Sequence, residues 1–305
     1  IGLKDLLYRY GRSISQRSLS GEKAVTQITR LSRTFAAHSP SLRADTPLSN
    51  DQIARVAPSI LATEAHESRS NRYTYIPTIK VLDGLRKEGF EPFFVCQTRV
   101  RDDSKREHTK HMIRLRHATQ INGAEADEII MLNSHDGSSS YQMIAGMFRF
   151  VCKNGMVCGD TLSDIRVPHK GNIVDNVIQG AFDVLDGFNL IREQKEGMQA
   201  VTLQREEQAL LAETALSLKY EPNADVPAPI TPDQLLRARR TEDRNDDLWT
   251  TFNRIQENMI RGGLRGRSAT GRTMTTREVA GIDQNVKLNR ALWVLGEGMR
   301  KLKQG

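Results

Sequence analysis

The fold is decided by three consecutive runs, FEPFFVCQTRVR at residues 90–101, HTKHMIRLRHA at 108–118 and EIIMLNSH at 128–135. Each is rich in β-branched, aromatic and other apolar residues, as strands are. Both faces of the first run are apolar at its start, which predicts burial of that end. In the second run Ile113 and Leu115 share one face, while Lys110, Met112, Arg114 and Arg116 share the other. Because strand side chains alternate between faces, this pattern predicts one buried face and a solvent-facing cationic row.

Helical patterns flank the three strands. Residues 76–88, IPTIKVLDGLRKE, carry an apolar stripe at helical spacing, and Gly89 suits the position after a helix end. Residues 140–153, SYQMIAGMFRFVCK, predict a second helix through the stripe Met143, Ile144, Met147, Phe148 and Val151. We therefore expect an α+β fold: a small antiparallel β-meander packed on helices, with a β-β-β-α core and a helical C-terminal part.

The remaining patterns divide the chain into four parts. Residues 1–65 form an N-terminal helical arm, with helices expected at 24–37 and 46–65, and residues 66–220 form the α+β core. The core ends in short extended pieces at 156–160 and 165–169, a helix from 172 to 188, and a more polar continuation at 192–220. A proline-rich linker at 221–232 precedes a helical C-terminal region at 233–305, with helices at 233–240, 246–260 and 284–303 around a Gly/Arg loop.

Composition points to a folded, basic protein. The 305 residues are 38% hydrophobic and 27% charged, with a formal net charge of +7. A basic chain favours polyanionic partners, since each neutralised phosphate releases counterions, although a merely soluble basic protein fits equally well. Three cysteines are too few for a disulfide scaffold, and no apolar run reaches the roughly 18 residues of a membrane helix. We expect a cytoplasmic protein with reduced thiols and no membrane association.

Two basic stretches are candidate nucleic-acid sites. The first is the hairpin between the two opening strands, where period two places several cations on one face, as a groove that tracks the DNA backbone needs. Its members are Arg99, Arg101, Lys105, Arg106, Lys110, Arg114 and Arg116. On the expected helix at 140–153, Arg149 and Lys153 are weaker candidates. A solvated sheet face is the alternative for the whole stretch.

The second stretch is RGGLRGRSATGRTMTTR at residues 261–277. It holds four glycines and no acidic residue. Its five arginines are Arg261, Arg265, Arg267, Arg272 and Arg277. Glycine lets backbone amides approach a phosphate, and arginine supplies a forked donor. The spacing differs from a Walker motif, which places Lys-Ser/Thr after the glycines. The sequence predicts a flexible polyanion-binding loop, with a plain basic linker as the alternative.

Catalytic and metal patterns are weak. NSHDGSSS at residues 133–140 contains His135, Asp136 and serines, but a triad is built in space, and neighbours on a strand point to opposite faces. An Asp-Gly turn followed by a serine helix cap explains the run. His108 and His111 lie three apart on a strand, so they face opposite ways, and no Cys-x-x-Cys or His-Glu-x-x-His occurs. We expect no catalytic residue, metal or cofactor.

Three longer motifs resemble a known family. MLNSHDGSSSYQMIAGMFRFVCKNGMVCGD, IRVPHKGN and VIQGAFDVL, followed by TTREVAGIDQNVKLNRALWVLGEGM, resemble the plasmid- and prophage-encoded family catalogued as domain of unknown function 932, above all its YfjQ, YubP and YafZ-like branch. The resemblance covers most of the chain. It implies a mobile-element protein and brings no established catalytic residues.

A second resemblance lies in the order of elements alone. A helix, a three-stranded meander and a packed helix are similar to the core of the RecT, Redβ and Erf kind of single-strand annealing proteins. That resemblance implies rings or filaments with DNA in a basic groove, although fold analogy does not establish function.

The sequence thus predicts a non-enzymatic, oligomeric protein that binds single-stranded DNA and anneals complementary strands. With only 6% aromatic residues, we expect it to grip the backbone rather than stack bases. The alternative is a plasmid or phage anti-defence protein that inhibits a host enzyme by direct binding.

Overall fold

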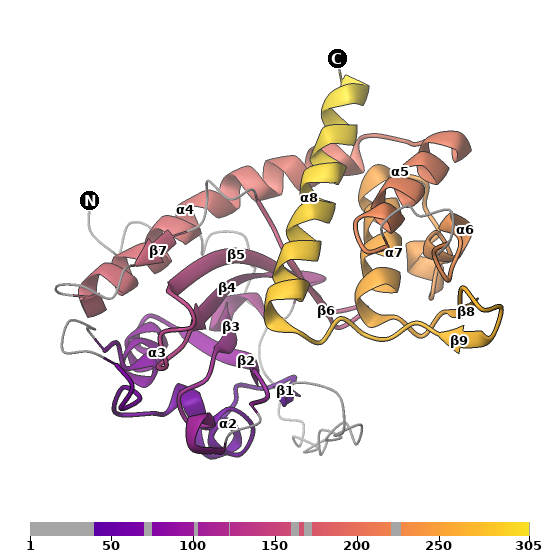
Figure 1. Cartoon of the computed structure of the whole chain (residues 1–305). Coiled ribbons are helices and arrows are strands. Elements are labelled where there is room, and N and C mark those ends of the chain that lie inside the picture. The colour runs from indigo at the N-terminus through magenta and orange to yellow at the C-terminus, as the bar shows by residue number, and fades with distance from the viewer. Residues whose placement is uncertain are drawn as a thin grey trace, which may run out of the picture.

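The computed structural model describes residues 40–69, 75–100, 103–121, 123–159, 165–167, 173–220 and 227–304. Strands dominate the first half and helices the second (Figure 1). The elements are β1 (Ser41–Arg43), α2 (Asn50–Val56), α3 (Thr78–Lys87), β2 (Phe90–Gln97), β3 (His111–His117), β4 (Glu125–Asn133), β5 (Tyr141–Arg149), β6 (Asn154–Val157), β7 (Ile165–Val167), α4 (Ile173–Gln199), α5 (Arg205–Ser217), α6 (Pro232–Leu235), α7 (Leu248–Arg261), β8 (Arg265–Arg267), β9 (Thr273–Thr275) and α8 (Ile282–Gln304).

The main sheet is an antiparallel meander in the order β1-β2-β3-β4-β5-β6, with β7 paired to β5. It curls, since the Arg43 guanidinium on β1 lies 5.2 Å from the ring centre of Phe148 on β5, although three strands separate them. The predicted α+β class, the antiparallel meander and the helical C-terminal part are confirmed.

Both faces of this sheet are buried. One face, which includes Ile113 and Leu115, joins the main core together with Val81 and Leu82 of α3. On the other face, Met112 and Ile130 belong to a second cluster that includes Ile282 from the start of α8. The prediction that β3 turns a cationic row to solvent is therefore wrong. Alternation shows which residues share a face, but not that a helix 170 residues later in the chain covers it.

The predicted helix at 140–153 is also wrong, because these residues form strand β5 and the turn after it. Apolar residues at 143, 144, 147 and 148 fit a helical stripe, yet the same spacing arises in a strand that is covered on both sides. Met143 and Met147 face the main core, and Ile144 faces the second cluster. The β-β-β-α order therefore fails at its last element, and the meander continues through β5 and β6.

Helix ends follow the capping chemistry of the sequence. Ser49 and Gln52 form the two reciprocal hydrogen bonds of a capping box at the start of α2. Of the helix expected at 46–65, only residues 50–56 are α-helical, because a proline follows at position 58. Residues 58–60 form a 3₁₀ turn instead. At α7, Asp247 accepts a 2.8 Å hydrogen bond from the Thr250 amide.

The helical part shares its core with the sheet. Buried side chains continue from the strands through α4 into α7 and α8. Trp249, Phe252 and Trp293 pack with ring centres 5.7–6.3 Å apart. Across the described ranges, no helix is both long enough and apolar enough to span a bilayer. The predicted helix at 24–37, Arg101 and the first half of the proline-rich linker lie outside the described residues.

Candidate nucleic-acid interface

The Gly/Arg stretch folds into a two-stranded antiparallel hairpin, β8 and β9, at the edge of the helical region (Figure 1). Arg265 lies opposite Thr275, and Arg267 lies opposite Thr273. Residues directly opposite each other in an antiparallel pair point to the same side. We call this hairpin, together with the residues that flank it at 261–277, the basic ribbon; one face of its two strands carries two arginines and two threonines.

Glycine at position 266 fixes which face is free. A Cβ on Gly266 would lie 1.9 Å from the backbone oxygen of Pro229, and the Arg267 amide donates a 2.9 Å hydrogen bond to that same oxygen. Residue 229 thus covers the glycine side of β8. Arg265 and Arg267 alternate with Gly266 and therefore project from the opposite side.

Most ribbon arginines have no ionic partner. Arg265, Arg267, Arg272 and Arg277 are exposed, and none forms an ion pair within the described part of the chain. The exception is Arg261, which pairs with Glu257 at 2.7 Å. The ribbon is thus a hydrogen-bonded scaffold for four unpaired guanidinium groups, where the sequence predicts a flexible loop.

The first basic stretch behaves in the opposite way. Arg114 and Arg116 are only 3% and 1% exposed. Their Nε atoms donate to the two carboxylate oxygens of Glu128 at 2.5 and 2.9 Å. Burial alone would raise the pKa of Glu128, but the positive charges of these arginines outweigh it and hold the pKa below its usual range. The prediction that Arg114 and Arg116 face DNA is wrong in this structure.

The other hairpin cations lie closer to the surface. Arg99, Lys105 and Arg106 are exposed, so they remain candidates for DNA contact. Lys110 forms an ion pair with Asp283 at the start of α8. That contact joins the hairpin to a distant helix.

Arg149 and Lys153 are engaged elsewhere. Arg149 is only 9% exposed and pairs with Asp243 at 3.0 Å and with Glu125 at 3.5 Å, which ties β5 to the helical region. Its predicted DNA contact is therefore wrong in this structure. Lys153, in the turn after β5, pairs with Asp45 at 2.7 Å while both side chains stay largely exposed.

The histidine and serine run is structural. His135 is fully buried, and its ring packs 4.8 Å from Tyr75. Asp136 accepts hydrogen bonds from the amide and hydroxyl of Ser138, which makes the expected turn. The turn leads into a strand rather than capping a helix.

One buried pair has the elements of a nucleophile and its base. Thr78 Oγ1 lies 2.9 Å from His111 Nε2, and the Asn133 amide donates to the same hydroxyl at 3.0 Å. Burial lowers the pKa of His111 to about 4, although its Nδ1 contact with the Thr109 carbonyl acts against this. All three side chains are at most 1% exposed, so no substrate reaches them.

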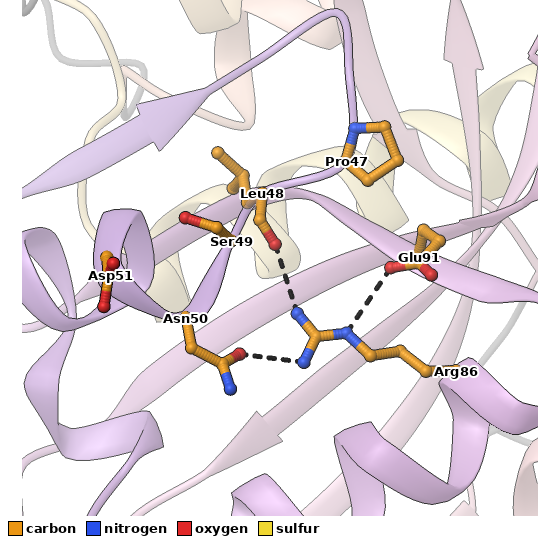
Figure 2. A pocket seen from close by; sticks show the side chains of 7 residues that line it. All are labelled: Pro47, Leu48, Ser49, Asn50, Asp51, Arg86 and Glu91. Atoms are coloured by element: carbon orange, nitrogen blue, oxygen red, sulfur yellow. Dashed lines mark hydrogen bonds and ion pairs between the residues drawn. The ribbon is translucent and has the colours of Figure 1, made fainter.

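An open pocket of about 460 Å³ lies between the start of α2 and the end of α3 (Figure 2). Arg86 crosses it and donates to Asn50 at 2.8 Å and to the Leu48 carbonyl at 3.1 Å, while Glu91 pairs with its Nε. These contacts fasten α2 to α3 and β2, and they leave the guanidinium little capacity for a ligand.

Thiol and metal chemistry find no support in the described ranges. Cys96, Cys152 and Cys158 are buried thiols outside any disulfide, and burial raises the pKa of Cys96 to about 12. A thiol that stays protonated is a poor nucleophile. No cluster of three or more His, Cys, Asp or Glu side chains there has the geometry to hold a metal ion.

The described fold and surface define an α+β protein with a curled antiparallel sheet, a helical C-terminal part and an exposed basic ribbon. The chain belongs to the family described as Domain of unknown function (DUF932), whose model matches residues 65–293, so the resemblance seen in the sequence is confirmed. It is 53% identical to UPF0380 protein YafZ of Escherichia coli (strain K12) over 272 residues, which cover 89% of this chain and 98% of the relative. UPF0380 protein YfjQ of the same strain is also 53% identical, over 270 residues that cover 88% and 97%. No solved structure matches significantly.

Sequence reasoning missed two groups of residues. Thr273 and Thr275 share the ribbon face with the arginines, and their signal was the alternation T-M-T beside Arg272. Arg43, which is partly exposed, approaches Arg114 and Arg116 from an edge strand 71 residues before Arg114, and no local pattern marks it.

Proposed function

We propose that this protein binds single-stranded DNA through the basic ribbon and promotes annealing of complementary strands. The observation that carries the proposal is the set of four exposed arginines without ionic partners. Unpaired guanidinium groups close together repel one another, and a polyanion relieves that repulsion.

The chemistry of the ribbon favours contact with the DNA backbone. Guanidinium forks match phosphate oxygens, and the hydroxyls of Thr273 and Thr275 add donors on the same face. No aromatic residue occurs between residues 261 and 277, so the bases have no stacking platform there. A strand held by its phosphates keeps its base edges free to pair, which is what annealing requires.

The test compares two double variants by anisotropy of a labelled oligothymidylate at several salt concentrations. Replacing Arg265 and Arg267 with alanine should weaken binding and flatten the slope of log K against log salt by roughly 1–2. The matched control replaces Lys287 and Lys301, two exposed lysines of α8, and should leave the slope unchanged. Equal slopes in both variants would remove the ribbon from the DNA site.

A second assay follows the pairing of two complementary labelled oligonucleotides. The wild-type protein should accelerate pairing at low salt, and the ribbon variant should not. A protein that binds no DNA at any salt concentration would contradict the proposal and favour an inhibitor of a host enzyme. The predicted homo-oligomer stays a prediction, which light scattering with and without DNA checks.

A further inference from the structure

The concave side of the curled sheet contains an unusual group of charges, which we call the arginine cluster: Arg43, Arg114, Arg116 and Glu128. Glu128 is fully buried and pairs with Arg114 and Arg116. The Arg43 guanidinium packs against aromatic rings instead, 4.7 Å from the centre of Phe94 and 5.2 Å from that of Phe148. Three positive charges thus surround one negative charge.

Two guanidinium nitrogens in this cluster lack partners. Nη1 of Arg43 and Nη2 of Arg116 are buried without a hydrogen bond in the structure. The guanidinium of Arg116 also lies over the Phe148 ring, 3.5 Å from its centre, so both arginines border the same ring. Buried polar groups are nearly always satisfied, and a buried charge is costly unless it is paired.

Neighbouring groups do not balance this excess. Burial, together with the positive charges of Arg114 and Arg116, lowers the pKa of Arg43 to about 10 despite the attraction of Glu128. The next acid, Asp45, is 62% exposed and already pairs with Lys153. Rings stabilise a cation by about 0.5–2 kcal/mol, which is less than a buried counter-charge provides.

We propose that the arginine cluster is a binding site for a small oxyanion of the phosphate class, held by the free nitrogens of Arg43 and Arg116. Such an anion supplies the missing negative charge and accepts a hydrogen bond from each of the two nitrogens. Arg43 lies on the edge strand β1 and, unlike the other three members of the cluster, is partly exposed, so its side of the cluster is the route by which an ion enters. The site is separate from the ribbon and does not rest on the proposed DNA binding.

The test measures thermal unfolding in sodium phosphate against sodium chloride at equal ionic strength and near-neutral pH. The protein carries Arg265→Ala and Arg267→Ala, which weakens phosphate binding on the ribbon. A saturable rise in Tm specific to phosphate is expected, because a ligand that binds only the folded state stabilises it. Phosphate also stabilises proteins because it is excluded from their surface. Variants of the cluster therefore distinguish a rise in Tm caused by binding from one caused by exclusion.

Arg43→Met should abolish the saturable part of the rise and leave the protein at least as stable in chloride, since it removes an uncompensated charge. Lys153→Met, at a largely exposed cation that pairs with Asp45 outside the cluster, should keep that rise. A rise retained in Arg43→Met, or equal in chloride, would overturn the proposal. If Arg43→Met fails to fold, equilibrium dialysis of labelled inorganic phosphate against the Arg265→Ala, Arg267→Ala variant tests the site instead. We expect one bound ion per chain. The absence of bound phosphate would contradict the site.

A deoxynucleoside monophosphate serves as the second probe. Equal stabilisation by both probes assigns the site to the free ion, and stronger stabilisation by the nucleotide assigns it to the phosphate of a larger molecule. Either outcome supports an oxyanion site provided that Arg43→Met abolishes it.

Discussion

The two basic stretches of this chain have similar composition and opposite fates. In the hairpin, Arg114 and Arg116 are buried against Glu128. In the ribbon, Arg265 and Arg267 are exposed and have no ionic partner in the described part of the molecule. Arginine-rich sequence alone therefore does not indicate a nucleic-acid surface.

The difference arises from the neighbouring strand. Glu128 on β4 lies directly opposite Arg116, so the hairpin has an acid at hand, and α8 covers part of the same sheet face. Among the described strands, β8 and β9 pair with each other and with no third strand, and the strand opposite the ribbon arginines carries threonine. A basic side chain is engaged in the fold where an acid lies on the same sheet face and solvent is excluded. It remains available to a ligand where it is exposed and has no acid beside it.

Removal of the buried acid should have the largest effect. Glu128→Gln leaves three guanidinium groups without a counter-charge, so we expect the free energy of unfolding to fall by about 3–5 kcal/mol. Urea denaturation measures it. Glu91→Gln, on a partly exposed ion pair with Arg86 at 3.4 Å, is the control and should cost less than about 1 kcal/mol. Similar losses in both variants would show that the arginine cluster does not depend on Glu128.

Acid should weaken the buried region next. The pKa of His111 is about 4 in the folded protein, lowered by burial from 6.5, so the unfolded chain binds more protons between these values. The stability that neutral His111 contributes to the free energy of unfolding is fully present above pH 6.5 and is lost as the pH falls to 4. The loss is about 3 kcal/mol at most. The lowered pKa of half-buried His117 acts in the same direction. In denaturation series across this range, His111→Gln should flatten the slope, and an unchanged slope would exclude His111 as its source.

The attachment of the ribbon is tested by one methyl group. Gly266→Ala places a Cβ against the Pro229 carbonyl, so the backbone of β8 must shift, at a cost of about 1–3 kcal/mol. Gly298→Ala on α8 is the control, because nothing lies within 4 Å of its Cβ position, and alanine should stabilise that helix by about 0.5–1 kcal/mol. Equal stability of the two variants in thermal melts would mean that residue 229 does not hold the ribbon.

The smallest effect on stability should come from the ribbon arginines themselves. Arg265→Ala with Arg267→Ala should change the free energy of unfolding by less than about 0.5 kcal/mol, because both side chains are exposed and unpaired. Arg114→Ala, by contrast, removes a buried partner of Glu128 and should destabilise the protein severely. A large loss of stability in the ribbon variant would contradict the division between structural and available arginines.

Local patterns predicted most elements. Strands β2, β3 and β4, helix α3 and the long C-terminal helices lie where apolar periodicity placed them, with ends differing by a few residues. Strands β1, β8 and β9 were not predicted, and β5 was assigned to a helix because Met143, Ile144, Met147 and Phe148 lie at helical spacing; all four are buried. A strand covered on both sides loses the alternation that would identify it.

The α+β class, the Asp136 turn and the family follow from the amino-acid sequence, because they depend on residues close together in the chain or on long matching motifs. Which cations are available follows from the folded structure instead. Arg114 is neutralised by an acid 14 residues away, Arg149 by one 94 residues away, and Lys110 by one 173 residues away. Charge pairing and exposure depend on distances in space, which periodicity along the chain does not encode.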